Sequence, residues 1–73
     1  MPKACILIKT VPAASDRIVE NLKKMKAVTK AFIAYGRWDI VAFINASADE
    51  MGKISGTINS IEGVRSSETL PEA

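Results

Sequence analysis

Residues 28–44, VTKAFIAYGRWDIVAFI, contain two apolar runs on either side of a turn. The runs Val28–Ala34 and Ile40–Ile44 are rich in the β-branched and aromatic residues that favour strands. Gly36 lies between them, and glycine adopts the positive φ angle of tight turns without strain. The stretch therefore predicts a β-hairpin whose turn is Tyr35–Asp39.

The turn also carries the one tryptophan of the chain, Trp38, next to Arg37 and Asp39. A core cannot easily cover a large ring that is held in a turn, and such amphipathic rings are common at contact surfaces. We therefore expect the hairpin to be a contact surface or a binding site.

The segment before the hairpin has the pattern of a strand followed by a helix. The apolar run Cys5–Ile8 indicates a strand, Ala4–Thr10, that is covered on both faces. Pro12 ends this strand, and Ser15 is predicted to cap the helix that follows. One face of that helix is apolar, through Ile18, Val19, Leu22 and Met25.

The segment after the hairpin repeats this pattern. Ser47 and Glu50 have the spacing of a capping box, which predicts the start of a second helix. Gly63 is expected to end this helix in a left-handed conformation, and Pro71 to end a last strand, Val64–Leu70. The apolar face of the second helix is Met51, Ile54, Ile58 and Ile61.

Two glycines, Gly52 and Gly56, interrupt the second helix, where each costs about 1 kcal/mol relative to alanine. One interpretation is close packing of the helix on the first helix or on the sheet. The other is the close approach of a ligand or a neighbouring chain.

The two halves of the chain match when Val28 is aligned with Val64, 36 residues later. Each half then reads strand, helix, strand, which predicts an α+β, ferredoxin-like β-α-β-β-α-β fold. Right-handed crossovers place both helices on one face of a four-stranded antiparallel sheet. Apolar pairs that coincide in this alignment are Leu7 with Phe43, Ile18 with Ile54 and Leu22 with Ile58.

The opposite face of this sheet is predicted to be apolar as well, through Cys5, Leu7, Val41 and Phe43. Soluble monomers avoid large exposed apolar patches. We therefore expect a homodimer in which two sheets pack face to face, as in dimeric α+β barrels, and higher assembly is compatible with it.

Composition limits the classes of function. The 73 residues suit one domain, residues 1–73, and no signal peptide or membrane-spanning run is visible, so a cytoplasmic protein is expected. With no histidine and one cysteine, the chain is expected to bind no metal and no cofactor, and Cys5 is more simply a small strand residue than a reactive thiol. The net charge of +2 gives no support for direct DNA binding.

The sequence resembles the effector-binding (RAM) domain of the Lrp/AsnC regulators. The resemblance rests on ACILIKT at residues 4–10, YGRWDIVA at residues 35–42, which is similar to the G-x-x-D signature of the family, and IEGV at residues 61–64 with Thr69. No residues precede the first strand that would build a helix-turn-helix, so a stand-alone RAM domain is expected.

The resemblance implies a small-molecule, amino-acid effector-binding and oligomerisation module linked to transcriptional regulation of amino-acid metabolism. It implies a homodimer that assembles into an octamer or a similar ring, association with full-length Lrp/AsnC regulators, and an effector bound between dimers. The implied ligand-binding residues are Gly36, Arg37, Trp38, Asp39, Ser47, Ala48, Thr69 and Leu70.

The hairpin residues suit an amino acid chemically, because Asp39 offers an anion for the ammonium group, Arg37 and turn N–H groups offer donors, and Trp38 offers an apolar wall. Each residue also has a structural interpretation. Asp39 can accept from backbone N–H groups, Trp38 can pack at an oligomer contact, and Arg37 can be solvated.

Two alternatives to a sensor remain open. Dimeric ferredoxin-like domains also serve as small enzymes, but the absence of histidine and of paired carboxylates gives little support for catalysis. A purely structural oligomerisation module is the third possibility, and ligand affinity separates it from the sensor.

Overall fold

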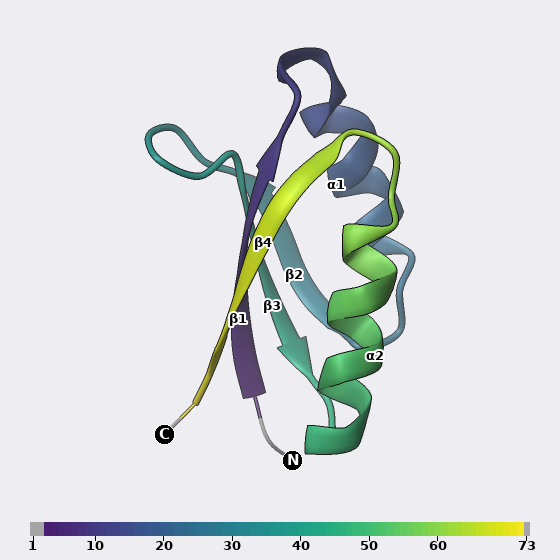
Figure 1. Cartoon of the computed structure of the whole chain (residues 1–73). Helices are drawn as coiled ribbons and strands as arrows, with labels where there is room; N and C mark the ends of the chain where they lie inside the picture. Colours follow the sequence, from purple (N-terminus) through teal and green to yellow (C-terminus); the bar gives the residue numbers. More distant parts are fainter. Residues whose placement is uncertain (1–2, 73) are drawn as a thin grey trace.

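The computed structural model describes residues 3–72 and contains four strands, two helices and one short 3-10 turn (Figure 1). In chain order the elements are β1 (Lys3–Thr10), η1 (Pro12–Ala14), α1 (Ser15–Lys23), β2 (Val28–Ile33), β3 (Ile40–Asn45), α2 (Ala48–Asn59) and β4 (Val64–Pro71). The predicted β-α-β-β-α-β order is confirmed.

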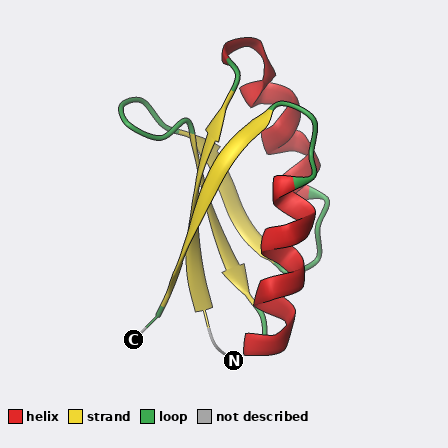
Figure 2. Cartoon of the chain, viewed as in Figure 1, coloured by secondary structure: helices red, strands yellow, loops and turns green. Residues whose placement is uncertain are grey.

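The four strands form one antiparallel sheet in the order β2-β3-β1-β4. Both helices lie on the same face of it, as Figure 2 shows. In the central pair, Ile6 is opposite Ala42 and Cys5 is opposite Phe43. This register separates the two sets of side chains as expected, because successive residues of a strand point to opposite faces.

The core lies between the sheet and the helices. Ile6 and Ile8 of β1, Ile40 of β3, Leu22 of α1 and Ile58 of α2 are completely buried. Alternate residues of β1 and β3 are therefore inaccessible on the helix side, and burial of this apolar surface is the main term that stabilises the fold.

The other face of the sheet carries no helix of residues 3–72 and presents apolar side chains. Phe32 of β2 is 38% exposed, Phe43 of β3 40% and Leu70 of β4 43%. Leu7 lies between them and is half-buried. We call this surface the open face. Its existence confirms the expectation that both faces of the sheet are apolar.

The two helices begin differently. Ser47 accepts the Glu50 N–H while the Glu50 carboxylate accepts the Ser47 N–H, so the capping box is confirmed. The prediction that Ser15 caps α1 was wrong. The cap position is Ala14, without a side-chain hydrogen bond, and the Ser15 hydroxyl instead pairs with that of Thr10 at 2.8 Å.

Other boundaries also differ from the sequence expectation: β1 begins at Lys3, β3 ends at Asn45, and β4 includes Pro71, which was expected to end it at Leu70. Gly63 has the predicted positive φ, +101°, but α2 already ends at Asn59, so Gly63 shapes the loop before β4 and does not cap the helix. A side chain at Gly63 would meet Ala14 at 2.8 Å. Strand β2 ends at Ile33, before the expected Ala34.

Neither helix within residues 3–72 is long and apolar enough to cross a membrane.

Candidate functional site

The loop of the hairpin between β2 and β3 projects from the sheet on the side away from the helices, near the end at which β1 leads into α1 (Figure 1). Its base is closed by the Ala34 N–H, which donates to the Asp39 carbonyl at 2.9 Å. Gly36 has φ +127°, a conformation that other residues rarely adopt, so the predicted need for glycine in this turn is confirmed. Tyr35, next to it, is 97% exposed.

Asp39 anchors the hairpin to β1 through its backbone and its side chain. Its N–H donates to the Ile8 carbonyl at 2.9 Å, and its Oδ2 accepts the Thr10 N–H at 2.9 Å. The side chain therefore ties two segments that are 29 positions apart in sequence. The Asp39 carboxylate therefore accepts a backbone N–H, as its structural interpretation expected. The donor lies in β1 and not in the turn to which Asp39 belongs.

The other two hairpin residues flank this anchor. The Lys9 ammonium donates to the Arg37 carbonyl at 2.9 Å, which holds the turn against the end of β1. Arg37 itself is exposed and Trp38 is half-buried. The hairpin thus presents a carboxylate, a guanidinium and an indole within three consecutive residues at one end of the sheet.

The remaining expected site residues lie at the other end of the sheet. Ser47 and Ala48 follow β3 and begin α2, while Thr69 and Leu70 lie opposite Ile6 and Cys5 of β1. At about 3.3 Å per residue, the five steps from Cys5 to Thr10 on β1 correspond to about 17 Å. One chain therefore does not bring the two groups of residues together.

A groove lies beside this second group, between the first half of α2 and the end of β4. We call it the α2–β4 groove; its volume is about 400 Å³ and its lining is Lys3, Ala48, Met51, Gly52, Ser55, Thr69, Pro71 and Glu72. The Ser55 and Thr69 hydroxyls, 2.7 Å apart, join the two elements at its floor. Of this lining, the sequence pointed to Ala48, Thr69 and, through its cost in a helix, Gly52.

Neither helix glycine is explained by packing inside the chain. A methyl group at Gly52 or Gly56 would meet no atom of a neighbouring element within 4 Å among the described residues. Close packing on α1 or the sheet, the simpler interpretation from sequence, is therefore wrong.

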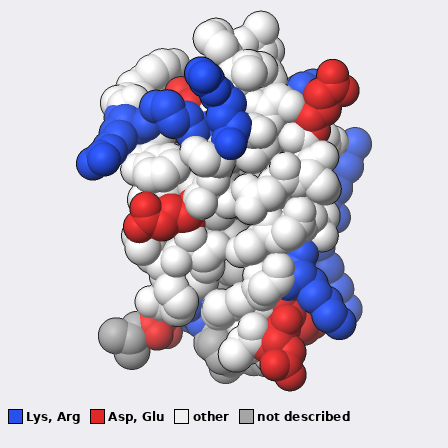
Figure 3. Space-filling view, in the orientation of Figure 1, with Lys and Arg blue, Asp and Glu red and all other residues white. Residues whose placement is uncertain are grey.

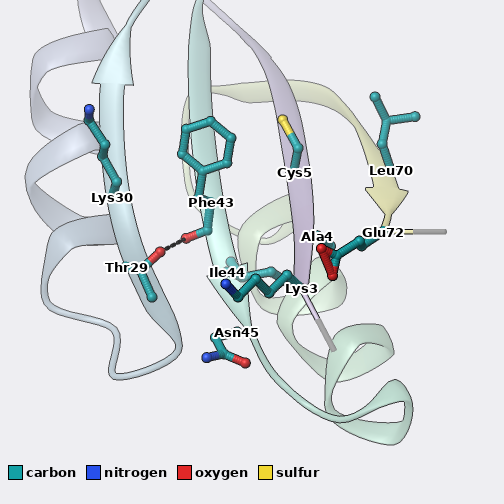
Figure 4. A pocket seen from close by; sticks show the side chains of 10 residues that line it. All are labelled: Lys3, Ala4, Cys5, Thr29, Lys30, Phe43, Ile44, Asn45, Leu70 and Glu72. Atoms are coloured by element: carbon teal, nitrogen blue, oxygen red, sulfur yellow. Dashed lines mark hydrogen bonds between the residues drawn. The ribbon is translucent and has the colours of Figure 1, made fainter. Parts of the chain in front are cut away.

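The open face contains a second and larger hollow, of about 580 Å³, at the end of the sheet where β1 begins and β4 ends (Figure 4). Phe43, Cys5 and Leu70 line its apolar part, with Lys30 and Asn45 at its rim. Asn45 Oδ1 is buried and has no hydrogen-bond partner among the described residues. Leu70, expected in the ligand site, lies here and not in the α2–β4 groove.

Glu50 is the ionisable group of residues 3–72 whose pKa is clearly perturbed. The pKa of its carboxyl lies below its ordinary value, first because it accepts the Ser47 backbone N–H and second because it accepts the Ser47 hydroxyl. The cause is the capping box, so this shift belongs to helix structure and not to a catalytic group.

Comparison with known proteins identifies the fold. No protein-family model matches the sequence, and no curated protein matches it significantly. Among solved structures, TTHA0845 from Thermus thermophilus is 25% identical, with a TM-score of 0.95 over 100% of this chain and 94% of that chain. FFRP-DM1 is 21% identical, with a TM-score of 0.94 over 100% of both chains.

AsnC of E. coli is 23% identical, with a TM-score of 0.86 over 97% of this chain but 50% of that chain. The chain therefore corresponds to about half of AsnC. The structural neighbours are Lrp/AsnC-family proteins, and this chain has the ferredoxin-like fold of their RAM domain.

Proposed function

We propose that residues 1–73 form a RAM-type module that binds a free amino acid and oligomerises, in the service of transcriptional regulation of amino-acid metabolism. The observation that carries the proposal is the hairpin end of the sheet. There the Asp39 carboxylate is held through one oxygen, Oδ2, by the Thr10 N–H, with Arg37 and Trp38 beside it.

The chemistry of this end suits a zwitterion. Asp39 supplies the negative charge for an ammonium group, and a carboxylate that is already fixed loses little freedom when it binds. Arg37 supplies a cation for the carboxylate of the ligand, and Trp38 supplies an apolar wall. Ser47, Ala48, Thr69 and Leu70 contribute from another copy of the chain, because they lie at the far end of their own sheet.

The assembly that we propose begins with a dimer through the open face. Phe32, Phe43 and Leu70 would be removed from water by a second sheet, which stabilises the pair in proportion to the apolar area buried. Dimers then join into an octamer or a similar ring, and full-length Lrp/AsnC regulators are candidate partners through the same face.

Thermal unfolding in the presence of each of the twenty amino acids tests this function. A ligand at about 100 times its dissociation constant stabilises the folded state by ~2.7 kcal/mol, which is several degrees in a domain of this size. We expect a rise in melting temperature with one or a few amino acids. No rise with any of them would refute effector binding.

One observation favours a second candidate, a purely structural oligomerisation module. Asp39 already accepts the Thr10 N–H, so its carboxylate has a role without any ligand. This candidate predicts the same assembly and no response to any amino acid.

A further inference from the structure

The register of the sheet arranges the side chains of the open face in rows that cross all four strands. In the strand order β2, β3, β1, β4, one row is Lys30, Phe43, Cys5 and Leu70, as Figure 4 shows. The next row toward the hairpin is Phe32, Val41, Leu7 and Glu68. Each of the two rows is therefore apolar in its middle and carries a charge at one edge of the sheet.

The charges of these rows have opposite signs on opposite edges. The β2 edge contributes Lys30, whose ammonium lies 5.6 Å from the centre of the Phe32 ring and so reaches toward the second row. The β4 edge contributes the Glu68 carboxylate. Carboxylates are visible in Figure 3 on the left side of the molecule, which is the sheet side in Figure 1. Among residues 3–72 neither Lys30 nor Glu68 forms an ion pair.

The other charged groups of this face lie at its two ends. Where β1 begins, Lys3 lies beside Glu72, whose N–H donates to the Lys3 carbonyl, so the two opposite charges are neighbours. The hairpin end carries the remaining charged side chains, Lys9, Arg37, Asp39 and Arg65. The middle rows therefore keep a cation on the β2 edge and a carboxylate on the β4 edge.

A second copy that covers this face with aligned strands can do so in two ways. A two-fold axis parallel to the strands places β2 over β4 and β3 over β1, which is the reversed strand order. An axis across the strands places each strand over itself. The reversed order brings Lys30 of each copy to Glu68 of the other, whereas the second arrangement places the β4 carboxylates over one another. Charge complementarity therefore favours the reversed order.

Asn45 supplies an independent argument for the same orientation. Its Oδ1 is buried and has no partner among the described residues, and a buried acceptor without a donor is costly. Asn45 is opposite Lys3 in the register of its own sheet. When β3 lies over β1 of a second copy, Lys3 of that copy comes over Asn45 and can donate to it. When β3 lies over β3, the middle of the facing strand offers Val41 and Phe43, which have no side-chain donor.

We propose that a second copy covers the open face in the reversed strand order, with Lys30 of each copy paired to Glu68 of the other. Lys3 of each copy then donates to Asn45 Oδ1 of the other. The proposal rests on the dimer of the proposed function and deepens it, because it names the residues that set the orientation of the dimer and select its partner. A chain without a carboxylate opposite Lys30 is disfavoured as a partner.

Charge reversal tests the pairing by sedimentation equilibrium. Lys30→Glu and Glu68→Lys each place like charges at both contacts of a homodimer, so each should raise the dimer dissociation constant at least tenfold. An equimolar mixture of the two variants has opposite charges at both contacts and should dimerise like the wild type. Lys24→Glu, the same change at the exposed end of α1, is the matched control. A Lys30→Glu homodimer of wild-type affinity, or a mixture no tighter than the separate variants, would refute the pairing.

The contact of Asn45 has its own test. Lys3→Met removes the donor that the second copy supplies and should raise the dimer dissociation constant several-fold. An unchanged dissociation constant would refute this contact.

Cross-linking tests the orientation directly. In a Cys5→Ser background, Lys30→Cys combined with Leu70→Cys places thiols on opposite edges of one sheet, so a short bismaleimide can join them only between copies. We expect a covalent dimer from this double variant and none from either single variant. A covalent dimer from Lys30→Cys alone would place β2 over β2, and no covalent dimer from the double variant would equally contradict the reversed order.

These outcomes are distinct from failure of the proposed function. If Phe43→Lys is monomeric while Lys30→Glu dimerises like the wild type, the open-face dimer stands and its proposed orientation is refuted. A melting shift with an amino acid supports effector binding whichever orientation the dimer has.

Discussion

At the residue scale, Asp39 combines a structural hydrogen bond with the proposed recognition of an ammonium group. Its Oδ2 holds the Thr10 N–H, and Thr10 is buried. The sequence identified Asp39 as a candidate because of its place after a Gly-x-x pattern. It did not identify Thr10, because a contact between residues 29 positions apart depends on how β1 and β3 align.

Two substitutions separate these roles of Asp39. Asp39→Ala leaves the Thr10 N–H without its acceptor, which should cost about 1–3 kcal/mol of unfolding free energy. Asp39→Asn retains an oxygen acceptor but loses the charge, so stability should change less while affinity for the amino acid falls at least tenfold. Urea unfolding and calorimetric titration measure the two effects, and wild-type affinity in Asp39→Asn would exclude this carboxylate from the site.

Glycine substitutions at two positions should have opposite signs. Gly36→Ala places a side chain at φ +127°, which should destabilise the fold by about 1–3 kcal/mol. Gly56→Ala is in open space on α2 and should stabilise it by about 1 kcal/mol. Urea unfolding of both variants measures the difference; a neutral Gly36→Ala would contradict the turn conformation described above.

At the element scale, local sequence signals predicted the structure correctly where the residues that interact are near each other in sequence. The capping box of α2 was predictable because Ser47 and Glu50 satisfy each other within one turn. The cap of α1 was not, because Pro12 starts a 3-10 turn ahead of the helix and Thr10 takes the Ser15 hydroxyl. The sequence pointed to three residues of the groove beside α2, Ala48, Gly52 and Thr69, but not to the groove itself, since grooves depend on how elements pack.

The capping box should make the stability of α2 depend on pH. The pKa of Glu50 is lowered in the folded state, so its carboxylate stabilises the fold above the ordinary glutamate pKa, and this contribution is lost as the pH falls through the lowered value. Glu50→Gln should therefore be less stable than the wild type at neutral pH, and the difference should shrink in acid. Thermal unfolding from neutral pH into acid tests this; a difference that stays constant would contradict the sign.

At the scale of the whole molecule, the internal repeat was sufficient to predict the fold. Aligning Val28 with Val64 gave the element order, and alternation in β1 and β3 gave the two faces of the sheet. The expected site is divided between the two ends because β3, Ile40–Asn45, separates the hairpin from Ser47. Sequence alone did not show which surfaces of different copies would meet, because a contact between chains leaves only indirect signals in a sequence.

The open face gives a prediction about assembly. Phe43→Lys places a charge at the middle of the proposed dimer interface, where burial without a partner is costly. Because Phe43 points away from the core, the chain should still fold but sediment as a monomer at concentrations where the wild type is a dimer. Glu20→Lys, on the exposed surface of α1, is the control and should remain dimeric. A dimeric Phe43→Lys variant would rule out this face.

The measurement that tests effector binding most directly is the fluorescence of Trp38, the one tryptophan of the chain, during titration with free amino acids. We predict a saturable change in emission with one or a few amino acids, and loss of that change in Asp39→Asn. Unchanged emission across all twenty, in a protein that is folded and assembled, would contradict a site at the hairpin and support the structural oligomerisation module.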